Sequence, residues 1–317
     1  MEPVTPFRKR LDALLTPAEK RHAVYAFDMV GDLALIEIPQ PLQKKKKKIA
    51  HALLDANPRL TRVYEKVGQH GGKFRLENVR WLAGQKGTRT LHKEWGCVFA
   101  VEVGEAFFNP RLGTERQRVA ADIKKGQQVC VFFAGVGPFA ITIAKHAHPI
   151  RVMAIEWNPQ AIPFLNENIR RNKVENIIVP LQGDISKISP IPEFDHVIMP
   201  APETAITYLA RAVEWVSPKG GLIHLYAFMP KDGGEISLRT AITESLSNST
   251  RSWRISFFRK VSDFSPSVQQ VCVGIKVGQT KSARRKIHSV SFIRKRITKT
   301  NKPIRQPPKK NRVRAVA

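Results

Sequence analysis

The sequence predicts an α/β fold in which a doubly wound, mostly parallel sheet follows a smaller α+β domain. Three observations lead to this prediction. A glycine-rich turn at 133–139 lies between a strand-like and a helix-like run, strand-like and helix-like runs alternate from about residue 119 to 247, and two closing runs can pair as an antiparallel hairpin. Such alternation is typical of parallel sheets that carry helices on both faces.

The charge of the chain points to a polyanionic partner. The 317 residues carry a formal net charge of +27 and are 42% hydrophobic, so most of the chain is expected to fold. Nucleic acid is the first candidate partner.

The sequence has no apolar run of membrane-spanning length and no signal-peptide pattern, so we expect a cytoplasmic monomer with no membrane partner. Cys97, Cys130 and Cys272 show no metal-ligand spacing and are expected to be reduced, buried thiols, so no metal site is predicted.

Residues 1–26 are predicted to be a short polar extension in which Thr16 and Pro17 begin a helix. A domain at 27–118 is expected to position RNA or substrate. It opens with a strand-like run over 27–38, continues with a helix over 49–57 and ends with several short strands. Within it lies the lysine run 44–48, which is either a solvated helix start or a phosphate contact. The second reading makes Lys44, Lys45 and Lys46 candidate RNA ligands.

The domain at 119–277 is expected to hold the parallel sheet. Its strands are predicted at 128–133, 151–156, 177–181, 195–199 and 221–226, and its helices at 138–146, 159–172, 203–215 and 233–247. The closing hairpin is predicted from the runs 252–260 and 268–277. The tail, 278–317, carries fourteen Lys and Arg residues and no acidic residue, so it is expected to be disordered and to attract RNA through residues such as Arg284 and Arg285.

The glycine turn and two acidic residues predict a nucleoside-like ligand. Gly135 and Gly137 permit close approach of the backbone, Glu156 ends the second strand, and Asp184 follows the third. NAD enzymes also match this glycine pattern, but Pro138 removes a backbone N–H that would otherwise grip a pyrophosphate. A ligand with ribose and adenine but no phosphate fits better, and S-adenosylmethionine is such a ligand.

Combined motifs then show a resemblance to a known family. The chain resembles the archaeal and eukaryotic tRNA (guanine-N1)-methyltransferases, which act on the guanosine 3′ of the anticodon and are related to the wybutosine-pathway aminocarboxypropyl transferases. The resemblance covers residues 27–277 and implies a Rossmann-like class I methyltransferase fold. The motifs that carry it are Phe27-Asp28-Met29-Val30-Gly31-Asp32, Gly72-Lys73-Phe74-Arg75, Thr90-Leu91-His92-Lys93-Glu94-Trp95-Gly96, Phe108-Asn109-Pro110-Arg111-Leu112-Gly113-Thr114-Glu115-Arg116, the turn 133–139 and Glu156-Trp157-Asn158-Pro159.

The resemblance implies methyl transfer to N1 of guanine, with tRNA as partner. It implies that Glu115 takes the N1 proton and that Arg75 faces the guanine O6. It implies RNA contacts for Arg116. The residues expected to hold the cofactor, from the turn and from the resemblance, are Phe107, Arg111, Phe133, Ala134, Gly135, Gly137, Pro138, Phe139, Glu156, Trp157, Asp184, Ile185, Pro200 and Pro202.

Two departures from the family pattern leave alternatives open. Pro200 stands where the family has the asparagine of Asn-Leu-Pro, and only about 26 residues precede the strand at Phe27, where relatives often have a separate domain that checks tRNA shape. We expect the basic tail to replace part of that domain. The alternatives are an aminocarboxypropyl transferase, a methyltransferase with another RNA target, and a non-catalytic RNA-binding protein on the same fold. The intact turn with both acidic residues argues against the last of these.

Overall fold

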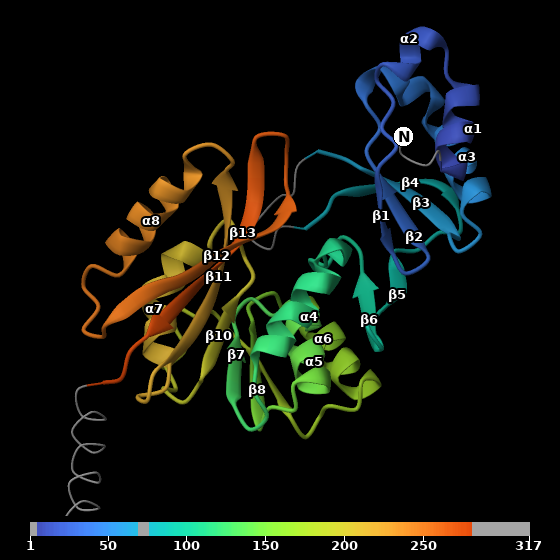
Figure 1. Cartoon of the computed structure of the whole chain (residues 1–317). Coiled ribbons are helices and arrows are strands. Elements are labelled where there is room, and N and C mark those ends of the chain that lie inside the picture. Colours follow the sequence, from blue (N-terminus) through green and yellow to red (C-terminus); the bar gives the residue numbers. More distant parts are fainter. Residues whose placement is uncertain (1–4, 69–75, 281–317) are drawn as a thin grey trace, which may run out of the picture.

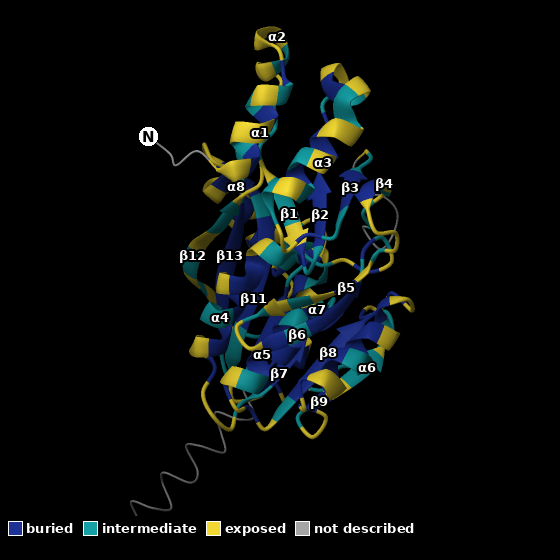
Figure 2. Cartoon of the chain, turned by 90° about the vertical axis from the view of Figure 1, so that its right-hand side faces the viewer, coloured by how far each residue is buried: buried dark blue, intermediate teal, exposed yellow. Residues whose placement is uncertain are grey.

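The computed structural model describes residues 5–68 and 76–280. Figure 1 shows a small N-terminal module, coloured blue to cyan, beside a larger α/β domain. Figure 2 shows that buried residues fill the strands of the large sheet, while exposed residues gather on the outer faces of the helices. Within these described residues, no helix is both long and apolar enough to cross a lipid bilayer.

The N-terminal module is a four-stranded sheet covered by helices. Its strand order is β1-β2-β3-β4. The elements are α1 (Pro6–Leu14), α2 (Pro17–Lys20), β1 (Phe27–Val30), β2 (Leu33–Ile36), the 3-10 helix η1 (Gln40–Lys45), α3 (Lys46–Ala56), β3 (Arg62–Lys66) and β4 (Val79–Gly84).

Helix α1 belongs to this module and is not a polar extension. Phe7 and Leu11 of α1 are buried in the same hydrophobic cluster as Ile49 and Leu53 of α3. The expected extension over residues 1–26 is corrected accordingly. The physical reason is that Phe7 and Leu11 lie four residues apart, so they share one face of a helix despite the charged residues between them.

The run expected as one strand over 27–38 folds as the hairpin β1–β2. Gly31 turns the chain with a φ of +58°, and a Cβ on it would lie 2.1 Å from the Thr90 Oγ1. Glycine is therefore required both for the turn and for the close approach to the second domain. The neighbouring Asp32 accepts hydrogen bonds from Thr61 and Arg62 of its own module and from Thr90 of the second domain, and the last of these joins the turn to that domain.

The larger domain contains the predicted parallel sheet, in the order β12-β13-β11-β10-β7-β8-β9. The closing hairpin pairs antiparallel, as expected. The strands are β7 (Gln128–Val131), β8 (Arg151–Glu156), β9 (Ile178–Gln182), β10 (His196–Met199), β11 (Gly221–Pro230), β12 (Trp253–Asp263) and β13 (Val268–Val277). Strand order reverses between β7 and β10, and ligands of such folds bind at the carboxyl ends of strands near this point.

Helices cover both faces of this sheet. Buried residues of α4, α5 and α6 share one hydrophobic cluster with Val129 and Val131, whereas those of α7 and α8 share another with Cys130 and Phe132. This split follows from the alternation of side chains along β7. The helices are η2 (Pro110–Leu112), α4 (Gly113–Asp122), α5 (Pro138–His146), α6 (Ala161–Arg171), η3 (Ala205–Tyr208), α7 (Leu209–Trp215) and α8 (Gly234–Ser245).

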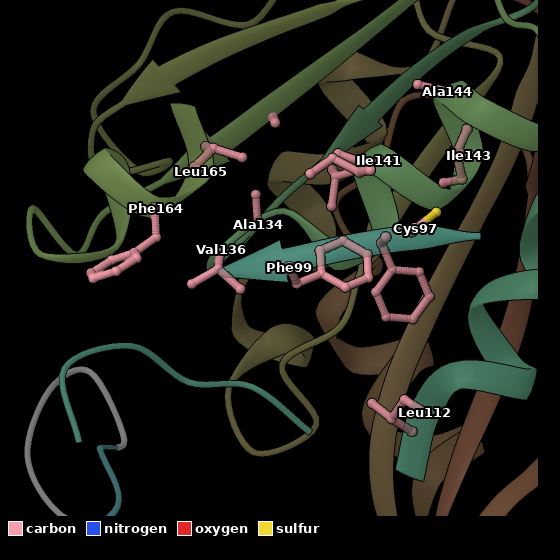
Figure 3. Packing of buried hydrophobic residues seen from close by; sticks show 14 of the residues in the cluster. Cys97, Phe99, Leu112, Ala134, Val136, Ile141, Ile143, Ala144, Phe164 and Leu165 are labelled. Atoms are coloured by element: carbon pink, nitrogen blue, oxygen red, sulfur yellow. The ribbon is translucent and has the colours of Figure 1, made fainter. Parts of the chain in front are cut away.

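A separate hairpin, β5 (Arg89–Glu94) and β6 (Cys97–Glu102), packs against the larger domain. Figure 3 shows Phe99 of β6 among Val136, Ile141 and Phe164 of the larger domain, and all four belong to one cluster. The domain boundary expected between residues 118 and 119 falls inside α4, which packs along α5. The hairpin and α4 are therefore parts of the larger domain.

Two asparagines bind the edge of β6: Asn168 within α6 and Asn172 at the C-terminal end of that helix. Asn168 exchanges two hydrogen bonds with the backbone of Ala100, at 2.6 and 3.0 Å, and donates a third to the Val136 carbonyl at 2.9 Å. Asn172 exchanges two with Val98, at 2.9 and 2.7 Å. The amides thus satisfy backbone groups that an edge strand would leave unpaired, and they tie the hairpin to the glycine turn.

Candidate functional site

The glycine turn adopts the backbone that the sequence pattern predicts. Phe133, Gly135 and Gly137 have φ values of +55°, +56° and +91°. The left-handed conformation favours glycine at 137, and a Cβ there would also displace the tip of the Leu165 side chain, 2.6 Å away. Pro138 is the first residue of α5, where its missing N–H costs nothing. Phe133 is not glycine, so its left-handed conformation is strained, as is common at functional sites.

Glu156 is held by the backbone of that turn. One carboxylate oxygen accepts a hydrogen bond from the Gly135 N–H and the other from the Asn158 N–H, both at 2.6 Å. The side chain is 8% exposed, and burial raises the pKa of the Glu156 carboxyl although these backbone hydrogen bonds oppose the shift. Each oxygen keeps a lone pair, so a ribose diol can donate to the same carboxylate.

A small cavity lies beside Glu156, at the carboxyl ends of β7, β8 and β9. Its lining residues are Phe133, Ile155, Trp157, Gly183, Asp184, Ile185 and Tyr208. Aromatic and aliphatic walls with one carboxylate suit an adenine ring and its amino group. The walls and the carboxylate therefore fit a nucleoside without phosphate. Four residues that the sequence predicted for the cofactor line this cavity: Phe133, Trp157, Asp184 and Ile185.

Tyr208 is a lining residue that the sequence reasoning missed. It comes from η3, and its ring meets that of Phe133 edge to face at 5.4 Å. No motif marks it, because it reaches the cavity only through the path of the chain after β10. Asp184 is oriented locally, since its Oδ1 accepts from the N–H and the hydroxyl of Ser186 at 2.9 and 2.7 Å.

The segment before α4 lies against the turn. The Phe107 carbonyl would be 3.3 Å from a Cβ on Gly135, and the Asn158 side chain donates to the Glu105 carbonyl at 2.9 Å. Phe107 is thus near the predicted cofactor site, with its side chain 36% exposed. Ala134 and Phe139 of the turn are buried, and the Ala134 N–H donates to the Ile155 carbonyl at 2.9 Å.

Glu115 lies in a buried polar network on the other side of the turn. Its carboxylate accepts two hydrogen bonds from Arg118, at 2.6 and 2.8 Å, and one from the Tyr226 hydroxyl at 2.6 Å. The residue is 8% exposed. Tyr226 in turn packs edge to face on Phe139 of the glycine turn, with ring centroids 5.5 Å apart. The proposed base and the proposed cofactor site are therefore neighbours.

Arg116 has a structural role, and its expected contact with RNA is corrected. Its side chain is 1% exposed, donates to the Glu94 carboxylate and the Asn109 carbonyl, and lies over the Phe108 ring. Burial on its own would raise the pKa of Glu94, but hydrogen bonds from His92 and Arg116 lower it. A guanidinium buried to this extent and ion-paired to Glu94 is not accessible to an RNA phosphate.

Arg111 does not reach the predicted cofactor cavity. Its Nε donates to Asp28 of the N-terminal module at 2.5 Å, and Lys66 binds the other oxygen of the same carboxylate at 2.7 Å. The expected cofactor contact of Arg111 is thus replaced by an ion pair that connects the two parts of the chain. The sequence places Asp28 and Arg111 in separate motifs, and only the fold brings them together.

The predicted RNA ligands fall into three groups. Lys45 and Lys46 bind Glu19 and Glu65, at 2.6 and 3.4 Å, whereas Lys44 is exposed. The lysine run therefore spans the end of η1 and the start of α3, and it pairs partly within the module. Arg75, Arg284 and Arg285 lie outside the described residues.

The loop after β10 carries the two predicted prolines. Pro200 and Pro202 are half-buried at the point where strand order reverses. The Ala201 carbonyl between them accepts from the N–H groups of Thr204 and Ala205, at 3.0 and 2.8 Å. A tight turn thus forms without the asparagine that the family resemblance implies.

The three cysteines are buried free thiols. Burial raises the pKa of each, which keeps it protonated and unreactive. Among the residues that the structure describes, no group of His, Cys, Asp and Glu has the arrangement of a metal site.

Two family models match consecutive parts of the chain. The TRM5/TYW2 methyltransferase domain matches residues 90–245, and the TYW2 N-terminal domain matches residues 7–88. The division between them lies just before β5, in agreement with the packing of the β5–β6 hairpin on the larger domain.

Individual relatives agree with these models. The chain is 38% identical to Trm5b, a tRNA (guanine(37)-N(1))-methyltransferase of Pyrococcus abyssi, over 67% of this chain and 62% of that protein. It therefore matches less than two thirds of the length of Trm5b. It is 32% identical to Taw21, a tRNA 4-demethylwyosine(37)-methyltransferase of Saccharolobus solfataricus, over 78% of this chain and 92% of that protein.

Solved structures of Trm5 proteins have a fold similar to that of this chain. The crystal structure of Trm5b from Pyrococcus abyssi has a TM-score of 0.78 at 32% identity and covers 88% of this chain and 82% of its own. The complex of aTrm5 with tRNALeu has a TM-score of 0.76 at 27% identity, with coverages of 88% and 80%. The expected α/β fold is confirmed by these similarities and by the sheet order.

Proposed function

Because the chain belongs to the TRM5/TYW2 methyltransferase family, we propose that it is an S-adenosylmethionine-dependent tRNA methyltransferase that modifies N1 of the guanosine 3′ of the anticodon. One observation carries the proposal. A small cavity between the carboxyl ends of β7, β8 and β9 lies next to Glu156 in sequence and to the glycine turn, and Phe139 at the end of that turn contacts Tyr226, whose hydroxyl binds the buried carboxylate of Glu115.

Different residues in and beside the cavity are proposed to contact different parts of the cofactor. Glu156 binds the ribose diol, Asp184 faces the adenine amino group, and Phe133, Ile155 and Tyr208 enclose the ring. The glycine turn permits close approach of the rest of the molecule. When bound, S-adenosylmethionine supplies an electrophilic methyl group.

Glu115 is the proposed acceptor of the guanine N1 proton. That proton is present near neutral pH, so a base must remove it as the new N–C bond forms. Oε1 of Glu115 accepts from both Arg118 and Tyr226, whereas Oε2 accepts only from Arg118 and so retains a lone pair for the proton. Arg118 and Tyr226 fix the carboxylate in one orientation, which is what a general base requires. Arg75 remains the proposed donor to guanine O6.

The direct test is incubation of the full chain with labelled S-adenosylmethionine and an unmodified tRNA transcript, followed by nucleoside mass analysis. We expect 1-methylguanosine 3′ of the anticodon. Glu115→Gln should reduce kcat about 10²- to 10⁴-fold while cofactor affinity stays unchanged. The matched control is Asp122→Asn, which removes the other carboxylate bound to Arg118 but leaves the proposed base in place. Full activity in Glu115→Gln would refute the role of Glu115.

Cofactor binding has its own test. Glu156→Ala should weaken binding of S-adenosylmethionine about 100-fold, because it removes the acceptor for the ribose and for two backbone N–H groups. Equilibrium binding of the cofactor to the unaltered chain also separates an enzyme from a purely RNA-binding protein. A chain that fails to bind it would support the non-catalytic alternative.

A second candidate function is methylation of 4-demethylwyosine at the same tRNA position. One observation favours it: the chain covers 92% of Taw21 at 32% identity. The same assay with tRNA that carries 4-demethylwyosine decides between the two. Methylation of that tRNA alone would favour the second candidate, and a mass gain of an aminocarboxypropyl group would favour the related transferases.

The basic tail is proposed to add nonspecific affinity for tRNA. Its fourteen basic residues would release counterions from the RNA, which makes affinity fall steeply with salt. Deletion of residues 278–317 should weaken tRNA binding and flatten the dependence of log Kd on log salt concentration. An unchanged slope would contradict the proposal.

A further inference from the structure

Two phenylalanines, one exposed and one half-buried, form an aromatic pair at the carboxyl end of β11. Phe228 lies near the carboxyl end of β11, and Phe264 follows β12 in the turn that leads to β13. Their ring centroids are 4.3 Å apart with planes at 40°, and Phe264 is 62% exposed. Figure 1 shows this turn at the end of the hairpin, beside the end of β11. Neither residue belongs to the cofactor cavity or to the Glu115 network.

The pair is aligned with the proposed base. Side chains alternate along a strand, so Phe228 lies on the same face of β11 as Tyr226, about 7 Å further toward the carboxyl end. The Tyr226 hydroxyl binds Glu115. A target guanine placed over Glu115 therefore has the aromatic pair beyond it, toward the carboxyl edge of the sheet at which the cofactor cavity also lies.

Two lysines bind the residue next to the exposed ring. Lys231 and Lys260 both bind Asp263, each at 2.9 Å, so two lysines share a single carboxylate. Hydrogen bonds from these lysines lower the pKa of Asp263, which stays ionised and leaves one net positive charge next to Phe264. An exposed aromatic ring beside unneutralised lysine is the pattern that single-stranded nucleic acid binds, through base stacking and phosphate contact.

We propose that Phe228 and Phe264 form a stacking platform for a nucleobase next to the target guanosine, and that this platform positions the tRNA loop. The proposal rests on the proposed function. Once the target base is flipped toward Glu115, its neighbour loses a stacking partner. The exposed face of Phe264 replaces that partner, while Phe228 supports the ring from behind.

The experiment measures tRNA binding by the full chain in the presence of S-adenosylhomocysteine, so that no turnover is needed. The tRNA carries 2-aminopurine at one of the two positions that flank the target, because its fluorescence reports stacking. We expect Phe264→Ala to weaken binding about 5- to 100-fold and to abolish the fluorescence change, in line with typical base–aromatic stacking energies. Phe264→Trp should restore both.

Salt dependence separates stacking from charge. Phe264→Ala should leave the slope of log Kd against log salt concentration unchanged, whereas Lys260→Ala should reduce it. Ile236→Ala is the matched control, since Ile236 of α8 is an exposed apolar residue, at 74%, without a ring. It should bind tRNA as the unaltered chain does.

Two results would overturn the proposal. Phe264→Leu with full affinity and an unchanged fluorescence response would show that apolar contact suffices without stacking. Normal tRNA binding by Phe264→Ala would show that the pair serves another partner, such as a protein. Tight tRNA binding with an intact fluorescence response but no methylation would instead refute the proposed function and leave the platform standing.

Discussion

The two sides of the candidate site are held in place by different forces. Around the glycine turn, backbone groups do the positioning: Glu156 is bound by two N–H groups, and Asn168 binds the Val136 carbonyl. Around Glu115, side chains do it, through a guanidinium and a phenol. The first arrangement joins the turn to the adjacent strand β8 and to α6, whereas the second combines Arg118, one turn further along α4, with Tyr226, which lies 111 positions away.

The difference separates binding from chemistry. Backbone contacts are rigid and carry no net charge, so the cofactor side should be insensitive to salt and to the state of neighbouring groups. Charged side chains in a buried setting interact strongly, and removing one partner leaves the other unsatisfied. We therefore expect substitutions on the two sides to differ in kind as well as in size.

The largest effect is expected for Asn168→Ala. It deprives the Ala100 N–H and carbonyl, and the Val136 carbonyl, of buried partners. The free energy of unfolding should fall by about 3–5 kcal/mol, since each buried unsatisfied group costs about 1–3 kcal/mol. Urea denaturation measures the change. Asn166→Ala, on the same helix, is the control, and an equal loss there would contradict the assignment to the hydrogen bonds.

Local patterns predict the cofactor side well. The turn 133–139 required glycines, and the structure shows positive φ at Gly135 and Gly137, with Glu156 next to them as the spacing indicated. The strands and helices of the sheet also follow from periodicity, within a few residues at most boundaries. Each of these features depends on neighbours in sequence or on adjacent strands, so short-range sequence patterns are enough to predict it.

Long-range pairing explains what the sequence did not reveal. Arg111 binds Asp28 across 83 positions, and Tyr226 binds Glu115 across 111. The family resemblance implied an RNA contact for Arg116, but Glu94 provides a buried partner that no spacing rule indicates. Tyr208 reaches the cavity through tertiary packing alone.

The second-largest effect is expected for Arg118→Met, which tests the side-chain network around Glu115. Glu115 would keep only the Tyr226 hydroxyl as a partner, so the free energy of unfolding should fall by about 3 kcal/mol, the size seen when a buried ion pair loses one member. Adding Glu115→Gln to this variant should recover part of the loss, because the unpaired charge disappears. The control is Arg171→Met, which breaks the exposed pair with Glu167 and should cost less than about 0.5 kcal/mol. Strict additivity of the two buried substitutions would argue against a coupled network.

The smallest effect, and the one with a distinct pH signature, is expected for Tyr226→Phe. It removes only the hydrogen bond to Glu115, which should cost about 1–2 kcal/mol near neutral pH.

Burial, together with the nearby Cys272 and Glu115, raises the pKa of Tyr226 well above 10.0. The folded chain therefore retains this proton where the unfolded chain has lost it. The stability that Tyr226 adds is complete below pH 10 and decreases above it, by about 1.4 kcal/mol per pH unit. Urea denaturation at pH 8 and at pH 10.5–11 should show the deficit of Tyr226→Phe shrinking at the higher pH. A deficit that stays constant would mean that the phenol is not buried against Glu115 in solution.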